Sequence, residues 1–250
     1  MKHRYFIEIM FDGTAYHGWQ VQPNSSTVQE QINQAISTVL GEDINVVGAG
    51  RTDTGVHAKQ MFAHFDSSIS FDGKDLIYKL NSFLKNDISV LRVFEVDDSA
   101  HSRFDAVSRK YEYLIHANKN PFLINKSWYF HRKLDVDLMN EASKLLINYT
   151  DFTSFSKLHT QTKTNNCSVK MAVWEKVNDT LVFSIEADRF LRNMVRAIVG
   201  TLVTVGEKKI SIEEFVEIIE SKNRSKAGAS APAHGLYLVS VKYPKTICDE

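Results

Sequence analysis

Apolar and polar residues follow one another along the chain with the spacing of strands and helices. Residues 4–10 are mostly β-branched or aromatic and are followed by Asp12-Gly13, which predicts a strand and a turn. Thr27-Val28-Gln29-Glu30 has the form of a capping box, and apolar residues then recur at helical spacing. We therefore expect a helix over 28–40 that ends at Gly41, where a left-handed residue is wanted.

Comparable patterns continue to the end of the chain. In the first half, they predict strands over 45–50, 61–66 and 89–96 and a helix over 75–84. In the second half, they predict a strand over 110–115, a helix over 138–146, and a hairpin of 169–176 with 180–187 around Asn178-Asp179. The longest helix is expected over 190–203, another helix from the capping box Ser211-Ile212-Glu213-Glu214 through Glu220, and a closing strand over 235–243.

The order of elements is much the same in the two halves of the chain. A strand, a helix and further strands are followed by a second set of similar plan. This repetition predicts an α+β fold of two halves, with residues 1–104 in one domain and residues 105–250 in the other.

Composition limits the class of protein. Apolar residues make up 43% of the chain and charged residues 24%, which excludes a disordered protein and allows a sizeable core. The formal net charge is zero, but residues 126–250 carry a small excess of basic residues, so a local basic surface is possible. The two cysteines, Cys167 and Cys248, are too few for a disulfide framework or a thiolate-rich zinc site.

Neither a membrane anchor nor a metal site is expected. The longest apolar run, over 197–205, is too short to span a bilayer, and the first residues lead directly into a strand. We therefore expect a cytoplasmic protein. The histidines His57, His64, His101 and His234 show no metal-ligand spacing with one another or with a cysteine.

Residues 48–58 carry the strongest chemical signal. Three glycines frame Asp53, which follows Arg51 and stands between two threonines. A carboxylate on such a turn can be presented to a ligand as a nucleophile or as a general base. The alternative is a tight turn in which Asp53 bonds its own backbone, because turns rich in Gly, Asp and Thr are common.

A second signal is the spacing of Arg189, Arg192 and Arg196 along the longest predicted helix. Their separations of three and four residues place them on one stripe beside its apolar face. A solvated basic face is the simpler interpretation for Arg189. Arg196 lies inside the apolar run, where a guanidinium requires a carboxylate or a phosphate as a forked partner.

Aromatic residues supply two weaker signals. Tyr111 and Tyr113 share one face of a predicted strand that follows Arg109-Lys110, and such a ring can stack on a nucleobase or belong to the core. Residues 16–22 precede the first helix with polar side chains that could contact RNA, although a packed loop around Trp19 is equally consistent.

Taken together and in order, these residues resemble the tRNA pseudouridine synthase A family. Residues 50–58 are similar to its signature loop, and residues 190–200 to a second motif. Residues 16–22, Arg103-Phe104, 111–113 and 231–236 also match in order and spacing, so the resemblance runs from about Tyr5 to Tyr243. The chain departs from the family at Ala233, often a proline, and in 165–168, where many members carry a basic residue.

The resemblance implies a fold and an activity. The fold would be two ferredoxin-like halves joined through a mainly antiparallel sheet with helices packed on it, and a cleft between the halves. The activity would be an isomerase that converts uridine to pseudouridine at positions 38, 39 and 40 of the tRNA anticodon stem-loop. Members of the family act as homodimers and use no cofactor, so tRNA and a second copy of the chain are the expected partners.

The resemblance also assigns roles to single residues. Asp53 corresponds to the catalytic aspartate, Arg196 to the arginine that pairs with it, and Tyr111 to the tyrosine that stacks on the target uracil. Arg51 corresponds to an arginine that helps to extrude the base. Thr54, His57 and Arg192 lie in the two family motifs and complete the expected substrate-binding set, with no metal ligand among them.

Two other classes of protein compete with this interpretation. A non-catalytic RNA-binding module also uses aromatic residues on a sheet, but it has no need for an acid among phosphates. A glycoside-cleaving enzyme usually needs two carboxylates, and no second acid stands in a comparable loop.

Overall fold

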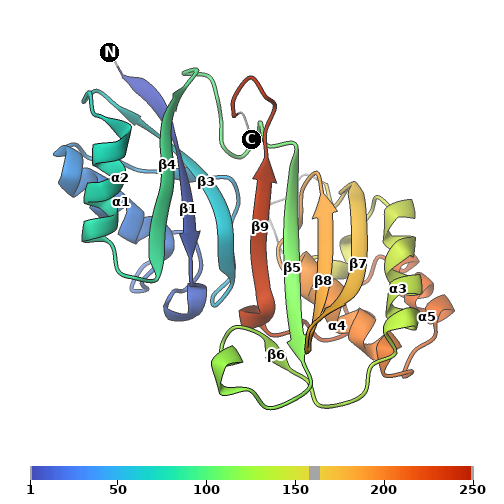
Figure 1. Cartoon of the computed structure of the whole chain (residues 1–250). Coiled ribbons are helices and arrows are strands. Elements are labelled where there is room, and N and C mark those ends of the chain that lie inside the picture. Colours follow the sequence, from blue (N-terminus) through green and yellow to red (C-terminus); the bar gives the residue numbers. More distant parts are fainter. Residues whose placement is uncertain (1, 158–163, 249–250) are drawn as a thin grey trace. The chain divides into compact units, whose positions relative to one another are not determined.

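The computed structural model describes residues 2–157 and 164–248 (Figure 1). The chain forms two compact units. Unit 1 comprises Met1–Val107 and Leu238–Glu250, and unit 2 comprises Ser108–Tyr237. Unit 2 therefore differs from the expected second domain, 105–250, because the residues from Leu238 onward belong to unit 1. The reason is bonding: the Val241 N–H donates to the Gln60 side chain at 3.0 Å, and the Tyr243 hydroxyl donates to the Ser102 carbonyl.

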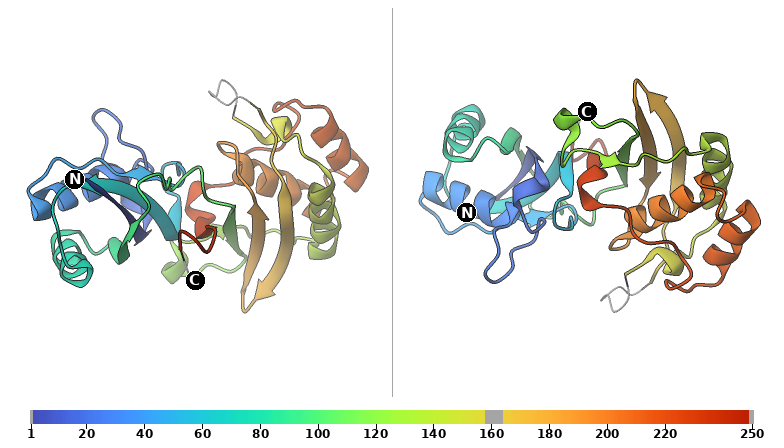
Figure 2. Two further views of the ribbon diagram at one scale, coloured as in Figure 1. Left: turned by 90° about the horizontal axis from the view of Figure 1, so that it is seen from above. Right: turned by 90° about the horizontal axis from the view of Figure 1, so that it is seen from below.

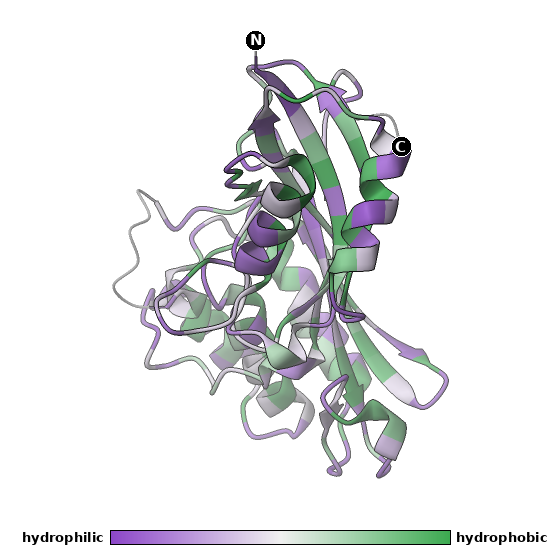
Figure 3. Ribbon diagram, turned by 90° about the vertical axis from the view of Figure 1, so that its left-hand side faces the viewer, coloured by the Kyte–Doolittle hydropathy of each residue, from purple (hydrophilic) through white to green (hydrophobic). Residues whose placement is uncertain are grey.

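Unit 1 contains a β-sheet with two α-helices. Its elements are β1 (His3–Phe11), α1 (Val28–Leu40), β2 (Val47–Gly48), β3 (His57–Ser67), α2 (Gly73–Phe83), β4 (Ile88–Val96) and most of β9 (Leu236–Lys242). The strand order is β4-β1-β3-β9, and β2 also pairs with β3. In Figure 3, α1 and α2 lie in front of the strands, on the same face of the sheet.

The first helix begins and ends as the sequence predicts. The Thr27 hydroxyl accepts the Glu30 N–H at 3.4 Å, and Gly41 is left-handed with φ of 69°. The second helix begins slightly earlier than its apolar spacing indicates, because the Asp72 carboxylate caps it by accepting two backbone N–H groups. Strands β1, β3 and β4 include the predicted ranges and extend beyond them.

The predicted strand over 45–50 is wrong in extent, since β2 contains only Val47–Gly48. Just before β2, the backbone of Val46 binds side chains of α1 and not a neighbouring strand. Asn33 accepts the Val46 N–H at 2.9 Å, and the Gln29 amide donates to the Val46 carbonyl at 2.7 Å. These hydrogen bonds satisfy the N–H and the carbonyl of Val46, which therefore need no partner in the sheet.

Unit 2 consists of a mixed β-sheet and three α-helices. Its elements are β5 (Ser108–His116), β6 (Trp128–Tyr129), α3 (Val136–Leu145), β7 (Val169–Val177), β8 (Thr180–Ala187), α4 (Met194–Gly206) and α5 (Ile212–Glu220). The main strand order is β5-β8-β7, with β6 parallel to β5. The helices α3, α4 and α5 contact one another and are grouped beside the β7–β8 hairpin (Figure 2).

Local signals in unit 2 are confirmed at two places. The hairpin turns at Asn178, which is left-handed with φ of 53°, and its strands pair in one continuous register near the turn. At the start of α5, Ser211 and Glu214 form a complete capping box.

The predicted helix over 190–203 is wrong at its start. Asn193 is left-handed with φ of 67°, and the Met194 N–H donates to the Leu191 carbonyl, so a turn precedes α4. The helix has 13 residues, as many as α1. Arg189 and Arg192 consequently lie before the helix, and the predicted stripe of three arginines does not exist.

Candidate active site

Asp53 lies in the loop between β2 and β3 of unit 1. Its backbone carbonyl accepts the Val56 N–H at 3.1 Å, and Gly55 takes a positive φ of 78°, so the residues after Asp53 form a tight turn. Asp53 is half-buried. The backbone of Asp53 therefore closes the turn.

A second segment holds this loop in place. The Trp19 N–H donates to the Thr52 carbonyl and the Gly55 N–H to the Tyr16 carbonyl, both at 3.3 Å. A Cβ on Gly18, whose φ is 87°, would lie 2.4 Å from the Thr52 oxygen, so only glycine fits. Trp19 itself is buried. Residues 16–19 are therefore a packed support for the Asp53 loop.

His57 supports the loop from the other side. Its side chain is 2% exposed, and Nδ1 lies 3.0 Å from the Asp12 carboxylate and accepts the Gly13 N–H at 3.1 Å. His57 is therefore enclosed, and its imidazole contacts residues that precede the loop in the chain. Asp12 was not singled out in the sequence, because its contact with His57 depends on tertiary structure.

Arg51 and Thr54 flank Asp53 and are exposed. Unit 1 thus brings four of the predicted residues together in one loop: Arg51, Asp53, Thr54 and His57. Three of these side chains are accessible to a ligand at least in part, and the fourth is internal.

The Thr52 hydroxyl allows a prediction about the stability of the protein. Its Oγ1 is buried and has no hydrogen-bond partner among the described residues. An unpaired buried hydroxyl costs about 1–3 kcal/mol. We expect Thr52→Val, which keeps the shape, to raise the free energy of unfolding by about 1 kcal/mol in urea titrations.

Thr27→Val is the matched control for this change. The Thr27 hydroxyl is also buried but accepts the Glu30 N–H as a helix cap. Its removal should lower the free energy of unfolding by about 1 kcal/mol. A loss of stability in Thr52→Val of the same size would mean that its hydroxyl is paired in solution.

In unit 2, Tyr111 and Tyr113 differ although both lie on β5. Tyr113 is fully buried, and its hydroxyl donates to the Pro232 carbonyl at 2.7 Å. Burial raises the pKa of Tyr113 far above its usual range. Tyr111 is half-buried, and its ring meets the Phe190 ring edge-on at 5.1 Å. Tyr113 is therefore a core residue, while Tyr111 keeps ring surface for a ligand.

Arg196 lies on the first turn of α4 and is half-buried. Its Nε donates to the Ala231 carbonyl at 2.8 Å, and the Ala231 N–H donates to the Arg196 carbonyl at 2.9 Å. Burial raises the pKa of Tyr113, and the positive charge of Arg196 opposes this shift. The orientation of the guanidinium is fixed from one side.

Arg192 is exposed in the turn before α4, where its carbonyl accepts the Lys157 N–H at 3.1 Å. Phe190 in the same turn was not predicted as part of a site. Its spacing fitted a helix, and no local signal indicates that its ring packs on Tyr111. Unit 2 thus carries Tyr111, Arg192 and Arg196 on one strand, one turn and one helix.

Comparison with known proteins identifies these motifs. A family model described as tRNA pseudouridine synthase matches residues 8–105 and 142–244. The chain belongs to the tRNA pseudouridine synthase family. Because pseudouridine synthases are isomerases, it is an enzyme of that class.

Relatives in this family match over almost the whole chain. The tRNA pseudouridine synthase A of Bacteroides thetaiotaomicron is 52% identical over 250 residues, covering 99% of this chain and 93% of that protein. The protein of the same name from Bacteroides fragilis is 52% identical over 246 residues, with 98% of each chain covered. That of Thermoanaerobacter pseudethanolicus is 42% identical over 239 residues, with 95% and 98% covered.

The family model covers most of the predicted site. The residues Arg51, Asp53, Thr54, His57, Arg192 and Arg196 fall within its matched ranges, whereas Tyr111 lies between them. The assignment of Tyr111 therefore depends more on its position on β5 than on this match.

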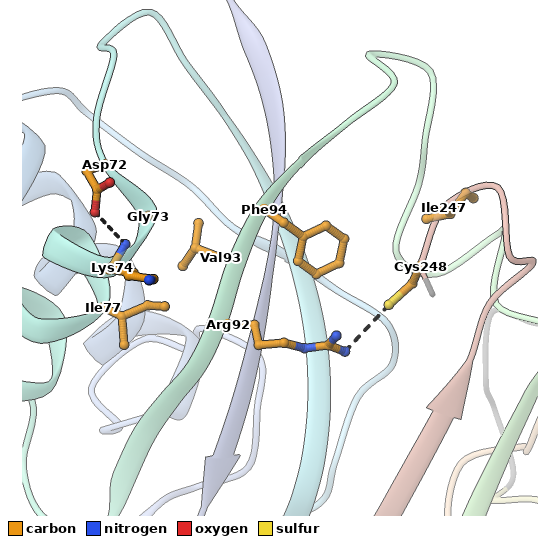
Figure 4. A pocket seen from close by; sticks show the side chains of 9 residues that line it. All are labelled: Asp72, Gly73, Lys74, Ile77, Arg92, Val93, Phe94, Ile247 and Cys248. Carbon is orange, nitrogen blue, oxygen red and sulfur yellow. Dashed lines mark hydrogen bonds between the residues drawn. The ribbon is translucent and has the colours of Figure 1, made fainter. Parts of the chain in front are cut away.

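A pocket of about 420 Å³ lies elsewhere in unit 1, between the start of α2, β4 and Cys248 (Figure 4). Arg92 crosses its wall, and one of its guanidinium nitrogens lies 3.5 Å from the Cys248 sulfur. None of the predicted site residues lines it.

No helix of residues 2–157 or 164–248 is long and apolar enough to cross a membrane. In the same residues, no three His, Cys, Asp or Glu side chains gather as a metal-binding group.

Proposed function

We propose that this protein converts uridine to pseudouridine at positions 38, 39 and 40 of the tRNA anticodon stem-loop. Membership of the tRNA pseudouridine synthase family supports the reaction. The observation that carries the proposal is the placement of Asp53 on a turn that two other segments hold. The competing classes of RNA-binding module and glycoside-cleaving enzyme do not account for this family membership.

The reaction breaks the bond from ribose C1′ to N1 of uracil and forms a bond from C1′ to C5. The proton on C5 leaves, and N1 gains one, so the product has the same atoms as the substrate. No electrons are exchanged with another molecule, and a carboxylate can drive the reaction. Attack of Asp53 on C6, attack on C1′ and removal of a ribose proton all use this one group.

We assign the remaining roles to residues of both motifs. Arg196 supplies a guanidinium that keeps the catalytic carboxylate ionised and oriented. Tyr111 stacks on the target uracil. Arg51 helps to extrude the target base from the stem, and this extrusion costs a few kcal/mol.

The exposed residues and the buried histidine have different tasks in this proposal. Thr54 and Arg192 contact the RNA, because both are exposed in the family motifs. His57 holds the loop and acts on the substrate only through it.

Architecture and assembly complete the proposal. We infer that each half follows the ferredoxin-like plan, because β1 is central between β4 and β3, with β2 beside β3, and because β5, β8 and β7 pair in the same relative order. We also propose that the protein acts as a homodimer in the cytoplasm and uses no cofactor.

Release of tritium tests the proposed function directly. With tRNA that carries tritium at C5 of uridine, each isomerisation should release one tritium to water. We expect release that stops at the number of target uridines in each tRNA. Absence of release, with intact folding and RNA binding, would contradict the proposal.

Tyr111 provides a prediction about its ring. If the ring acts mainly by stacking, Tyr111→Phe should keep most of the turnover, whereas Tyr111→Ala should lose on the order of 10–100-fold in kcat/KM. Single-turnover tritium release measures both variants. Equal losses in the two variants would transfer the role from the ring to the hydroxyl.

A further inference from the structure

Phe104 is an exposed aromatic residue on a turn of unit 1. It belongs to the segment that follows β4, and 72% of its surface is exposed. Its backbone N–H points to the His101 Nδ1 at 3.4 Å. A polar side chain would serve this turn equally well, so the ring needs another explanation.

The turn beneath Phe104 is held by many hydrogen bonds. The His101 N–H donates to the Asp105 carboxylate at 2.7 Å, and the Asp105 N–H returns to the His101 carbonyl at 3.1 Å. The Ser102 hydroxyl donates to the Val47 carbonyl at 2.7 Å, and the Tyr243 hydroxyl donates to the Ser102 carbonyl. Phe104 is therefore presented on a fixed turn.

One side of the Phe104 ring already lies against other flat groups. The His101 ring lies 4.2 Å from it, and the His64 ring lies 4.6 Å beyond His101. Burial lowers the pKa of His101, which suits the neutral imidazole that accepts the Arg103 N–H at Nδ1. The Arg103 guanidinium lies 5.6 Å from the Phe104 ring. These groups contact the ring, while 72% of the surface of Phe104 stays exposed.

We propose that Phe104 is a stacking platform for one unpaired nucleobase of the RNA substrate. This inference rests on the proposed function, which supplies an RNA with a single-stranded loop. Every nucleobase presents a flat face that can stack on an aromatic ring, and a neighbouring guanidinium favours the attached phosphate. The guanidinium beside the ring suits a ligand that carries a phosphate next to its base.

Binding of anticodon stem-loop RNA to ring variants tests this platform. Phe104→Ala should raise the Kd about tenfold, and Phe104→Leu should lose most of the same affinity because it lacks a flat face. Phe104→Trp should stay within about twofold of the natural protein. The fold-increase in Kd caused by Phe104→Ala should be the same at every salt concentration, because stacking releases no counterions.

Two controls separate this platform from general effects. Tyr78→Ala removes an aromatic side chain of similar exposure, 74%, from α2 and should leave the Kd unchanged. An RNA of the same stem with no unpaired nucleotides should bind the natural protein and Phe104→Ala equally.

The outcomes distinguish this inference from the proposed function. If the natural protein releases tritium and Phe104→Ala binds the stem-loop normally, the platform is wrong and the function stands. If Phe104→Ala dissociates an oligomer in size-exclusion chromatography at unchanged RNA affinity, the ring is a protein contact and the platform is wrong. If the natural protein releases no tritium from any tRNA, the proposed function itself is wrong.

Discussion

Asp53→Asn should reduce turnover by about 10⁴-fold or to the limit of detection, while tRNA binding survives. Asparagine has the shape of aspartate but can neither attack carbon nor accept a proton. The backbone carbonyl that closes the turn is unchanged, so the loop should keep its conformation. Single-turnover tritium release and a binding titration with the same tRNA measure the two properties separately.

The control for this variant is Asp43→Asn, an exposed acid between α1 and β2. It removes the same charge and should leave turnover within about twofold. If Asp53→Asn keeps near-normal turnover, Asp53 is a turn residue only. If it loses tRNA binding as well, its role in catalysis would not be separable from folding of the loop.

Arg196→Lys should lower kcat on the order of 10²-fold with a smaller effect on KM. The Arg196 Nε is committed to the Ala231 carbonyl, which leaves the outer nitrogens of the guanidinium in a fixed direction. A lysine ammonium cannot hold this carbonyl and also bind a carboxylate in a fork. Because lysine keeps the positive charge, the decrease in kcat measures the contribution of the guanidinium geometry.

Arg189→Lys is the matched control, since Arg189 lies before α4 and has no role in the proposed chemistry. It should retain normal kcat. Thermal unfolding of both variants is needed, because Arg196 also binds the segment around Ala231. A near-normal kcat for Arg196→Lys would show that Arg196 is an anchor for that segment and not a partner of the catalytic acid.

Local chemistry explains which parts of the fold are predictable from the sequence. The capping residues Thr27 and Ser211, the helix end at Gly41 and the turn at Asn178 depend on neighbours within a few residues. Their side chains and φ angles are as expected, because local capping and turn chemistry determines them.

The start of α4 is not predictable from local sequence. Residues 190 and 191 have apolar spacing that fits a helix, but the Asn193 side chain donates to the Ser230 hydroxyl at 2.7 Å and the Phe190 ring packs on Tyr111. Such contacts come from residues far along the chain, and the pattern of apolar residues does not contain them. They place Arg192 in a turn before α4 and not in the helix.

The candidate site divides in the same way. The glycines around Asp53 indicate the loop from the sequence alone, and residues 16–19 are recognisable as a motif. That Trp19 and Tyr16 bond the loop, and that His57 faces Asp12, becomes visible only in three dimensions. Residue types therefore predict the chemistry, whereas the supporting contacts require the fold.

The central claim is that this chain rearranges uridines at positions 38, 39 and 40. The most direct measurement is carbodiimide mapping by primer extension on an unmodified tRNA transcript after reaction with the natural protein or with Asp53→Asn. The account predicts alkali-resistant stops at these positions with the natural protein and none with the variant, and an RNA mass that does not change. Stops at other positions only, or no stops at all, would contradict it.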